Sequence, residues 1–525
     1  MNNNIFQKIK TGLASALLCS LVLVSCTDNF EDMNRNPAQP TDKEILEGYY
    51  KLGAFFPQML NYAYPAQENA YQMGENLIGD PYGRYLSIAN TWSSNFSTFN
   101  APAGWINSPF KDAFEKVYGG WTQVKEQTKG EGPLYAWAQI LRVTSMQRIT
   151  DLYGPIPYSK VGGGSLGSAY DSQEDVYKNM LTDLDAAIAE LTTFVAANPN
   201  YTAMAKFDKV YSGDFIKWIK YANSLKLRMA MRIVYANPEL AKQKAEEAVK
   251  HTLGVIVSNN DIAQNAFPQN PIWTVTTSWG DSRACADIIA YLSGYSDPRL
   301  SRYFTKSQVV NGPEYLGLRT GIAVPGKDWA DKYSSATYTQ TAPTLWLPAS
   351  EVAFLRAEGA LRGWDMGGTA KELYEEGVKL SFSQWLASGA DAYLQDAVSK
   401  PGDYNDPDPA LAAKAISTIT IKWNDADPFE TKLERVITQK WIAMYPLGQE
   451  AWSEQRRTGY PRFFPVLLNS NTDANLKTRF ASRIPFPPDE QNNNTQNYNE
   501  AVKLLGGQDN YSTKLWWDKN PNKGW

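Results

Sequence analysis

The fold is decided by residues 215–251, which read FIKWIKYANSLKLRMAMRIVYANPELAKQKAEEAVKH. Apolar residues recur here every three or four positions, which is the period of an amphipathic α-helix; they are Phe215, Trp218, Ile219, Ala222, Leu225, Met229 and Ile233. Asn237-Pro238 ends this predicted helix, because the residue before a proline disfavours the α conformation. A second helix, rich in Ala, Glu and Lys, follows over 238–251. The stretch therefore predicts two helices joined by a short turn.

The same helical pattern recurs on both sides of this pair. A helix predicted over 172–191 begins with a capping sequence, Ser172-Gln173-Glu174-Asp175. Further helices are predicted over 348–361, over 369–388 after a Thr-x-x-Glu capping box, and over 430–445. Small residues lie along several of these helices and allow the backbones to approach closely, as tetratricopeptide-type pairs require. We therefore expect a mainly α fold built on a tetratricopeptide-like scaffold of helical pairs.

Long stretches rich in Gly, Pro, Asn and Trp interrupt the helical pattern at 74–109, 254–346 and 457–525. Loops of this length inside a compact protein usually carry function. The chain of 525 residues is also unusually aromatic, with 17 Trp, 30 Tyr and 20 Phe. We expect one domain over 41–525, in which the helical scaffold carries an irregular, loop-rich, ligand-binding half.

The N-terminus predicts a lipoprotein signal peptide over residues 1–25. Two lysines precede a small and apolar run at 13–24, which is too short to span a bilayer because about 20 residues are needed. The run ends in Ser25-Cys26, which resembles the cleavage and acylation signal of bacterial lipoproteins, so Cys26 is the predicted lipidation site. Residues 26–40 are polar and predict an acylated tether. Two alternatives stay open: an ordinary secretory signal in which Cys26 is incidental, and a tether whose acidic residues are a plain linker rather than a surface-export signal.

Charge and residue usage argue against several function classes. Lys and Arg number 51 against 55 Asp and Glu, without basic clusters, so no nucleic-acid partner is expected. His251 is the one histidine and Cys285 the one cysteine outside the N-terminus, which disfavours metal sites, His-based triads and disulfides. The glycine-rich run at 162–167 matches catalytic patterns only formally, because no strand leads into it. Residues 403–408 lack the glycine and terminal glutamate of a calcium loop. We expect no cofactor, no metal and no catalytic residues.

Several further segments, taken in their order along the chain, indicate a particular protein family. They are FEDMNRNP at 30–37, TDLYGPIPYS at 150–159, ANSLKLRMAMR at 222–232, SDPRL at 296–300, EVAFLRAE at 351–358 and RIPFP at 483–487. Together with the N-terminal signal, they resemble the SusD/RagB family of outer-membrane nutrient-binding lipoproteins. The resemblance implies four helical repeat units packed against a less regular ligand-binding half. It also implies a protein, lipid-anchored at the cell surface, that captures a glycan or other nutrient for a SusC-like TonB-dependent transporter.

Aromatic residues in the irregular stretches favour carbohydrate binding. A sugar ring has an apolar C–H face on which Trp can stack, while Asn, Asp and Arg bond its hydroxyl groups. The stretches 90–100, 273–283 and 326–333 combine these residue types. We predict ligand contacts by Trp92, Asn95, Trp273, Trp279, Asp281, Arg283 and Trp329. For any one of these tryptophans, packing in the core or against the transporter remains the alternative.

Two other functions stay open for the sequence. The first is a glycoside hydrolase that uses two carboxylates, against which no acidic motif stands in a recognisable catalytic frame. The second is a structural lid of the transporter without ligand affinity of its own. We expect a binding protein rather than an enzyme, with starch, a host glycan, a plant polysaccharide or a peptide as possible ligand.

Overall fold

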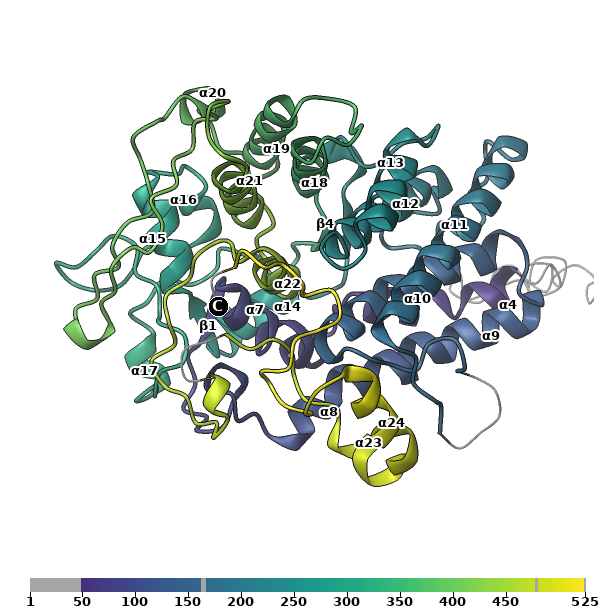
Figure 1. The fold of residues 1–525 in the computed structure, drawn as a ribbon, viewed down its shortest axis with the longest axis horizontal. Coiled ribbons are helices and arrows are strands. Elements are labelled where there is room, and N and C mark those ends of the chain that lie inside the picture. The colour runs from purple at the N-terminus through teal and green to yellow at the C-terminus, as the bar shows by residue number, and fades with distance from the viewer. Residues whose placement is uncertain (1–48, 162–166, 477–479, 524–525) are drawn as a thin grey trace, which may run out of the picture. The chain divides into compact units, whose positions relative to one another are not determined.

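A computed structural model describes residues 49–161, 167–476 and 480–523 (Figure 1). The chain divides into two units, Met1–Gly53 and Ala54–Trp525. Of the first unit the structure describes only helix α4 (Tyr49–Gly53), and all other described helices and strands belong to the second unit. The predicted signal peptide (1–25), tether (26–40) and lipidation site Cys26 lie outside the described residues, as does most of the glycine-rich run.

Most of the second unit is helical, as predicted. Its long helices are α10 (Gly132–Tyr153), α11 (Gln173–Ala197), α12 (Phe215–Arg232), α13 (Pro238–Lys250), α18 (Ala349–Leu361), α19 (Ala370–Gln384), α21 (Phe429–Ala443) and α22 (Gly448–Thr458). Consecutive helices pack in pairs, α10 with α11, α12 with α13 and α18 with α19, while α11 also packs on α12 and α18 on α21. Figure 1 shows this series running from α10 and α11 to α21. The predicted tetratricopeptide-like scaffold is confirmed.

The predicted helix starts are also confirmed. At the start of α11, the backbone N–H of Asp175 donates to the hydroxyl of Ser172 at 3.1 Å. At the start of α19, the N–H of Glu372 donates to the hydroxyl of Thr369 at 3.2 Å, and the N–H of Thr369 donates back to the Glu372 carboxylate at 2.9 Å. These side chains satisfy backbone donors that have no partner within a helix.

The predicted end of the helix that opens at Phe215 is wrong by several residues. Helix α12 ends at Arg232, and a turn closed by a bond from the N–H of Asn237 to the carbonyl of Ile233 at 2.8 Å separates it from α13. Asn237 instead caps α13 by accepting a bond from the N–H of Leu240 at 3.2 Å. The Asn-Pro pair therefore marks the start of the second helix rather than the end of the first.

The irregular stretches hold short elements. Strand β1 (Leu86–Ile88) pairs antiparallel with β3 (Ser282–Ala284), and β2 (Ala263–Asn265) with β4 (Thr344–Leu347). The shorter helices are α5 (Phe56–Ala63), α6 (Glu68–Tyr71), η1 (Gln72–Asn76), α7 (Gly79–Gly83), η2 (Phe96–Thr98), α8 (Ala103–Asp112), η3 (Ala113–Tyr118), α9 (Gly119–Thr128), η4 (Asn259–Asp261), α14 (Pro271–Trp273), η5 (Thr274–Ser278), α15 (Ala286–Gly294), α16 (Leu300–Tyr303), α17 (Lys327–Ala330), α20 (Ala390–Leu394), η6 (Pro409–Leu411), η7 (Ala474–Leu476), α23 (Pro488–Asn493) and α24 (Thr495–Leu505). Helix α15 was not predicted from the sequence. It is buried on nearly every side, so it lacks the polar face that makes a helical period recognisable.

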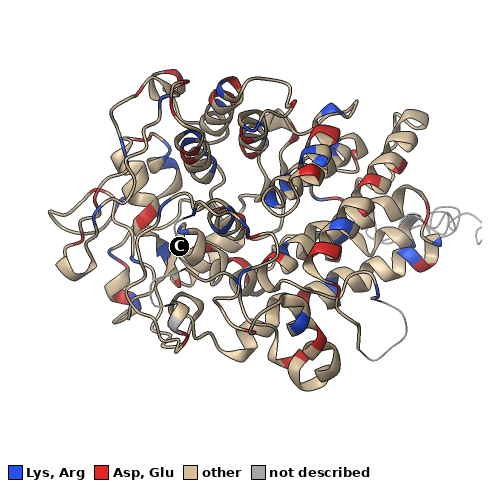
Figure 2. Ribbon diagram, viewed as in Figure 1, with Lys and Arg blue, Asp and Glu red and all other residues tan. Residues whose placement is uncertain are grey.

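A network of buried charges lies between α12, α18, α21 and α22. Glu454 is 2% exposed, and three cations donate hydrogen bonds to it: Arg232 at 2.5 Å, Arg457 at 2.7 Å and Lys440 at 2.8 Å. Arg457 also bonds Glu358 of α18 at 2.6 Å. Burial alone would raise the pKa of Glu454, but the three cations outweigh burial and hold this pKa well below its ordinary value. Figure 2 shows acidic and basic residues side by side on α21 and its neighbours.

The segments that resemble a known family supply much of this buried polar core. Arg232, from the segment 222–232, bonds Asp151 of the segment 150–159 at 3.2 Å. Arg228, from the same segment as Arg232, forms a two-pronged bond with Glu351 of the segment 351–358 at 2.7 and 2.8 Å. Arg483 bonds the carbonyl of Tyr153 at 2.9 Å. These motifs therefore maintain the fold, because buried ions need partners of fixed geometry.

Helices α7 and α22 contact each other through glycines. A Cβ atom on Gly448 would lie 2.5 Å from the backbone nitrogen of Asp80, and one on Gly83 would lie 2.3 Å from the carbonyl oxygen of Gly448. We expect Gly448→Ala to lower the free energy of unfolding by about 1–3 kcal/mol, because backbone atoms cannot move aside as a side chain would. Chemical denaturation measures the loss.

Gly119→Ala is the matched control for this substitution. Gly119 begins α9, and a Cβ atom there would meet nothing within 4 Å. Since alanine is the better helix former by about 0.5–1 kcal/mol, this variant is expected to be as stable as the wild type or more so. Equal stability of the two variants would contradict the close approach of α7 and α22.

Candidate functional site

The first predicted segment forms a loop after β1. Trp92 is half-buried, and its ring meets the ring of Trp105 edge-on, with centroids 5.1 Å apart. Asn95 is 3% exposed: its amide donates to the carbonyl of Trp92 at 2.9 Å, and its oxygen accepts from the N–H of Thr98 at 3.1 Å. The loop thus presents an indole, while Asn95 is engaged in fixing the loop's shape.

The second predicted segment connects α14 to β3. Trp273 ends α14 and Trp279 follows η5; both are half-buried. Arg283 lies on β3 and is 7% exposed; it donates to the carbonyl of Ser282 at 2.9 Å and pairs with Asp331. Arg283 therefore joins the second segment to the third rather than standing free.

The third predicted segment contains the short helix α17. Trp329 is half-buried on this helix and packs against a buried apolar cluster that includes Tyr333, with the two ring centroids 5.2 Å apart. The ammonium of Lys332 lies 4.5 Å from the centre of the Trp329 ring. Burial, followed by the charge of Asp406, raises the pKa of Tyr333, so its hydroxyl stays protonated and donates to Asp406 at 3.0 Å.

Asp281 brings the three segments together. Its carboxylate is 5% exposed and accepts hydrogen bonds from the amides of Asn90 and Gln72, each at 2.8 Å. The ammonium of Lys327, the first residue of α17, lies 2.5 Å from the same carboxylate and also donates to the carbonyl of Trp279 at 2.9 Å. One buried anion thus ties together the loop that holds Trp92, the turn that holds Trp279 and the helix that holds Trp329.

Several members of this arrangement were not predicted from the sequence. Gln72, Lys327 and Asp331 contribute partners to Asp281 and Arg283 but show no motif, because these contacts join residues 46 to 209 positions apart. Trp105, which contacts Trp92, lies just beyond the segment predicted for binding. Asn90 lies two residues before Trp92 in the sequence, and this position in a predicted binding segment is the one sequence feature that points to it.

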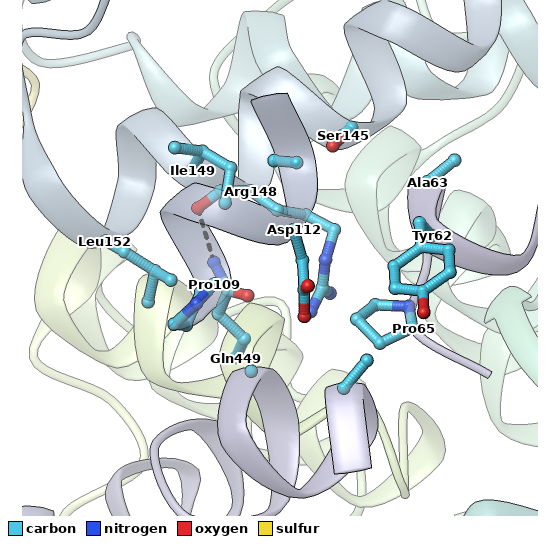
Figure 3. Close-up of a pocket in the computed structure, with 13 residues that line it drawn as sticks. Tyr62, Ala63, Pro65, Pro109, Asp112, Ser145, Arg148, Ile149, Leu152 and Gln449 are labelled. Atoms are coloured by element: carbon cyan, nitrogen blue, oxygen red, sulfur yellow. Dashed lines mark hydrogen bonds between the residues drawn. The ribbon is translucent and has the colours of Figure 1, made fainter. Parts of the chain in front are cut away.

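A small cavity lies elsewhere, between α5, α8 and α10 (Figure 3). Its volume is about 30 Å³, room for one water molecule. The amide of Gln449 donates to the carbonyl of Arg148 at 2.6 Å, and Asp112 also lines the cavity. Neither this cavity nor the surface clefts of about 360 to 670 Å³ is lined by any of the seven predicted ligand contacts. The predicted contacts therefore belong to a different surface.

Two further properties concern only the part of the chain that the structure describes. Over these residues, no group of three His, Cys, Asp or Glu side chains is placed to hold a metal ion. Asp403 bonds Lys414 at 2.7 Å, whereas Asp406 accepts from Tyr404 at 2.6 Å, so these carboxylates point to different partners. Among the same described residues, no helix is both long and apolar enough to cross a membrane.

Comparisons with known proteins agree with the fold. A family model described as SusD-like, the SusD and RagB outer membrane lipoproteins, matches residues 32–518. The solved structure of a chitin-binding SusD homologue from Flavobacterium johnsoniae is 39% identical, with a TM-score of 0.86 over 90% of this chain and 100% of that chain. A SusD homologue from Bacteroides uniformis is 42% identical, with a TM-score of 0.85 over the same shares. A SusD-like protein from Bacteroides thetaiotaomicron is 38% identical, also with a TM-score of 0.85 and the same shares. No curated protein gave a match.

Proposed function

The chain belongs to the SusD-like family of outer membrane lipoproteins, and from this premise we propose that it captures a glycan outside the cell for a SusC-like TonB-dependent transporter. Lipid on Cys26 anchors the protein to the outer membrane, and the tether over 26–40 holds the domain at the cell surface. The protein acts by equilibrium binding and release to the transporter, without chemical change of the ligand. The relative from Flavobacterium johnsoniae is described as chitin-binding, which supports a glycan as the ligand class.

The union of three aromatic segments at Asp281 is the observation that carries the proposal. Trp92, Trp279 and Trp329 are half-buried, so each indole is fixed by the protein and still offers surface to a ligand. Flat aromatic rings stack on the C–H faces of sugars and lose little conformational freedom in doing so. We propose that these rings, with Trp273, form the glycan-binding surface, and that Asn95, Asp281 and Arg283 position it.

The same contacts favour binding over hydrolysis. A glycoside hydrolase needs two carboxylates that reach the scissile bond, one of them as acid and the other as base or nucleophile. Asp281 is buried and accepts bonds from two amides and one ammonium, while Asp331 pairs with Arg283. Carboxylates engaged in this way serve as structural acceptors.

Alanine substitution of the four tryptophans tests the proposal. We expect Trp92→Ala, Trp273→Ala, Trp279→Ala or Trp329→Ala to weaken binding by roughly 1–3 kcal/mol for at least one of them, on the scale of aromatic stacking and burial. A glycan array identifies a ligand of the wild-type protein, and calorimetry with that ligand measures each variant. The matched control is Trp364→Ala, since Trp364 is half-buried in the turn between α18 and α19.

Calorimetry of the variants, a cleavage assay and a test of complex formation together distinguish the rival functions. Unchanged affinity in all four variants would place the binding surface elsewhere. Release of shorter products from a labelled polysaccharide would establish hydrolysis. If the wild type binds no glycan yet forms a complex with the transporter, the structural lid is the better description.

A further inference from the structure

A surface cleft lies where helix α24 meets the end of the chain. Its volume is about 670 Å³, within the range of small-ligand sites. Leu504 and Leu505, the last residues of α24, form one side, and Lys514, Trp516 and Lys519 contribute to the other. The cleft shares no lining residue with the surface at Asp281.

The aromatic wall of this cleft is held rigidly. Trp516 is half-buried, its backbone N–H donates to the side-chain oxygen of Gln173 at 2.9 Å, and its ring lies 6.1 Å from that of Tyr177, which is fully buried. Gln173 and Tyr177 both belong to α11 of the scaffold. An indole fixed from behind and open at the front can stack on a sugar ring.

Positive charge is in excess around the cleft. Its one acidic lining residue, Asp518, is buried and paired with Lys523. Burial lowers the pKa of Lys523, and the positive charges of Lys514 and Arg456 act in the same direction. Lys514 and Lys519 are exposed, and among the described residues no carboxylate lies within ion-pairing distance of either. Within the described residues, these two ammonium groups thus stand at the rim without an ion-pair partner.

We propose that this cleft is a second binding site, for a saccharide that carries carboxylate or sulfate groups. The sugar ring stacks on Trp516, its acidic group pairs with Lys514 and Lys519, and Leu504 and Leu505 cover its apolar edge. The inference goes beyond the glycan surface proposed above and does not depend on it.

Calorimetry with paired probes tests the second site. The probes are a galacturonic acid hexamer with its fully methyl-esterified form, and a chondroitin sulfate hexamer with its desulfated form. We expect the wild type to bind at least one acidic hexamer at least tenfold more tightly than its less charged partner, and the preference to shrink between 50 and 300 mM NaCl because salt screens exposed charges. The variant Lys514→Gln/Lys519→Gln is expected to lose at least tenfold in affinity. The control Lys242→Gln/Lys371→Gln removes two exposed charges from α13 and α19 and is expected to bind like the wild type.

Lysine acylation followed by mass spectrometry locates the ligand. Bound acidic hexamer is expected to protect Lys514 and Lys519, and Asp281→Asn is expected to leave this protection unchanged, which separates the two sites. The inference is overturned if neither acidic hexamer binds, if the methyl-esterified and desulfated probes bind equally well, or if the double variant retains wild-type affinity. Protection of other lysines only would overturn it as well.

Discussion

We expect Glu454→Gln to lower the free energy of unfolding by roughly 3–5 kcal/mol, the usual cost of removing one partner from a buried ion pair. The substitution keeps the volume of the side chain but removes its charge. Arg232, Lys440 and Arg457 then lose their shared partner while all three stay at most 1% exposed. The new amide group also adds a donor where the neighbours are already donors. Urea denaturation followed by circular dichroism measures the change.

An exposed ion pair on α24 provides the control. The side chains of Lys503 and Glu500 are 70% and 58% exposed and lie 2.6 Å apart. Because exposed pairs are worth about 0–1 kcal/mol, Glu500→Gln is expected to leave stability nearly unchanged. If Glu454→Gln were equally harmless, the charge network would not hold α12, α21 and α22 together.

The pH dependence of stability provides a second test of the role of Glu454. The pKa of Glu454 is held well below its ordinary value in the folded protein, so its charge contributes stability above the unfolded pKa of about 4.3. This contribution is lost as the pH falls through the lower, folded pKa. The difference in stability between wild type and Glu454→Gln is therefore expected to be full at neutral pH and to narrow progressively below about pH 4.

The charge network also explains how far the sequence could predict the fold. Helices such as α11 and α12 have one apolar face each, so their period is visible in the sequence. Helix α22 reads GQEAWSEQRRT, which is typical of an exposed helix, yet every one of its residues is buried. Its charged residues Glu454 and Arg457 are paired with Arg232, Lys440 and Glu358 from other helices, up to 222 positions away. Local periodicity carries no information about such partners.

The candidate site, too, could be predicted from the sequence only in part. Composition and loop length make Trp92, Trp279 and Trp329 candidates, because long loops inside a compact protein usually carry function and aromatic rings stack on sugars. The role of Asp281 could not be read from the sequence, since its amide partners Asn90 and Gln72 lie 191 and 209 positions away. The sequence therefore indicates the aromatic residues, whereas the hydrogen bonds of Asp281 that bring their segments together appear only in the folded chain.

Asp281→Asn is expected to weaken glycan binding about 100-fold, which corresponds to about 2.7 kcal/mol. The amide group of the variant turns a donor toward the amides of Asn90 and Gln72, and the charge that holds Lys327 is gone. The loop of Trp92 and helix α17 then lose their common anchor, so more than one ring leaves its position. Calorimetry with the ligand from the array measures the loss, and thermal unfolding shows whether the scaffold persists.

A double-mutant cycle separates positioning from general damage. If Asp281 holds the rings in place, removing the Trp279 ring from Asp281→Asn costs much less affinity than removing it from the wild type, because the ring no longer meets the sugar. Independent effects would instead add. Asp328→Asn is the control, since Asp328 is exposed on the same helix as Trp329 and its substitution removes the same charge. Wild-type affinity in a folded Asp281→Asn variant, or strict additivity in the cycle, would mean that the three segments do not depend on this carboxylate to form one binding surface.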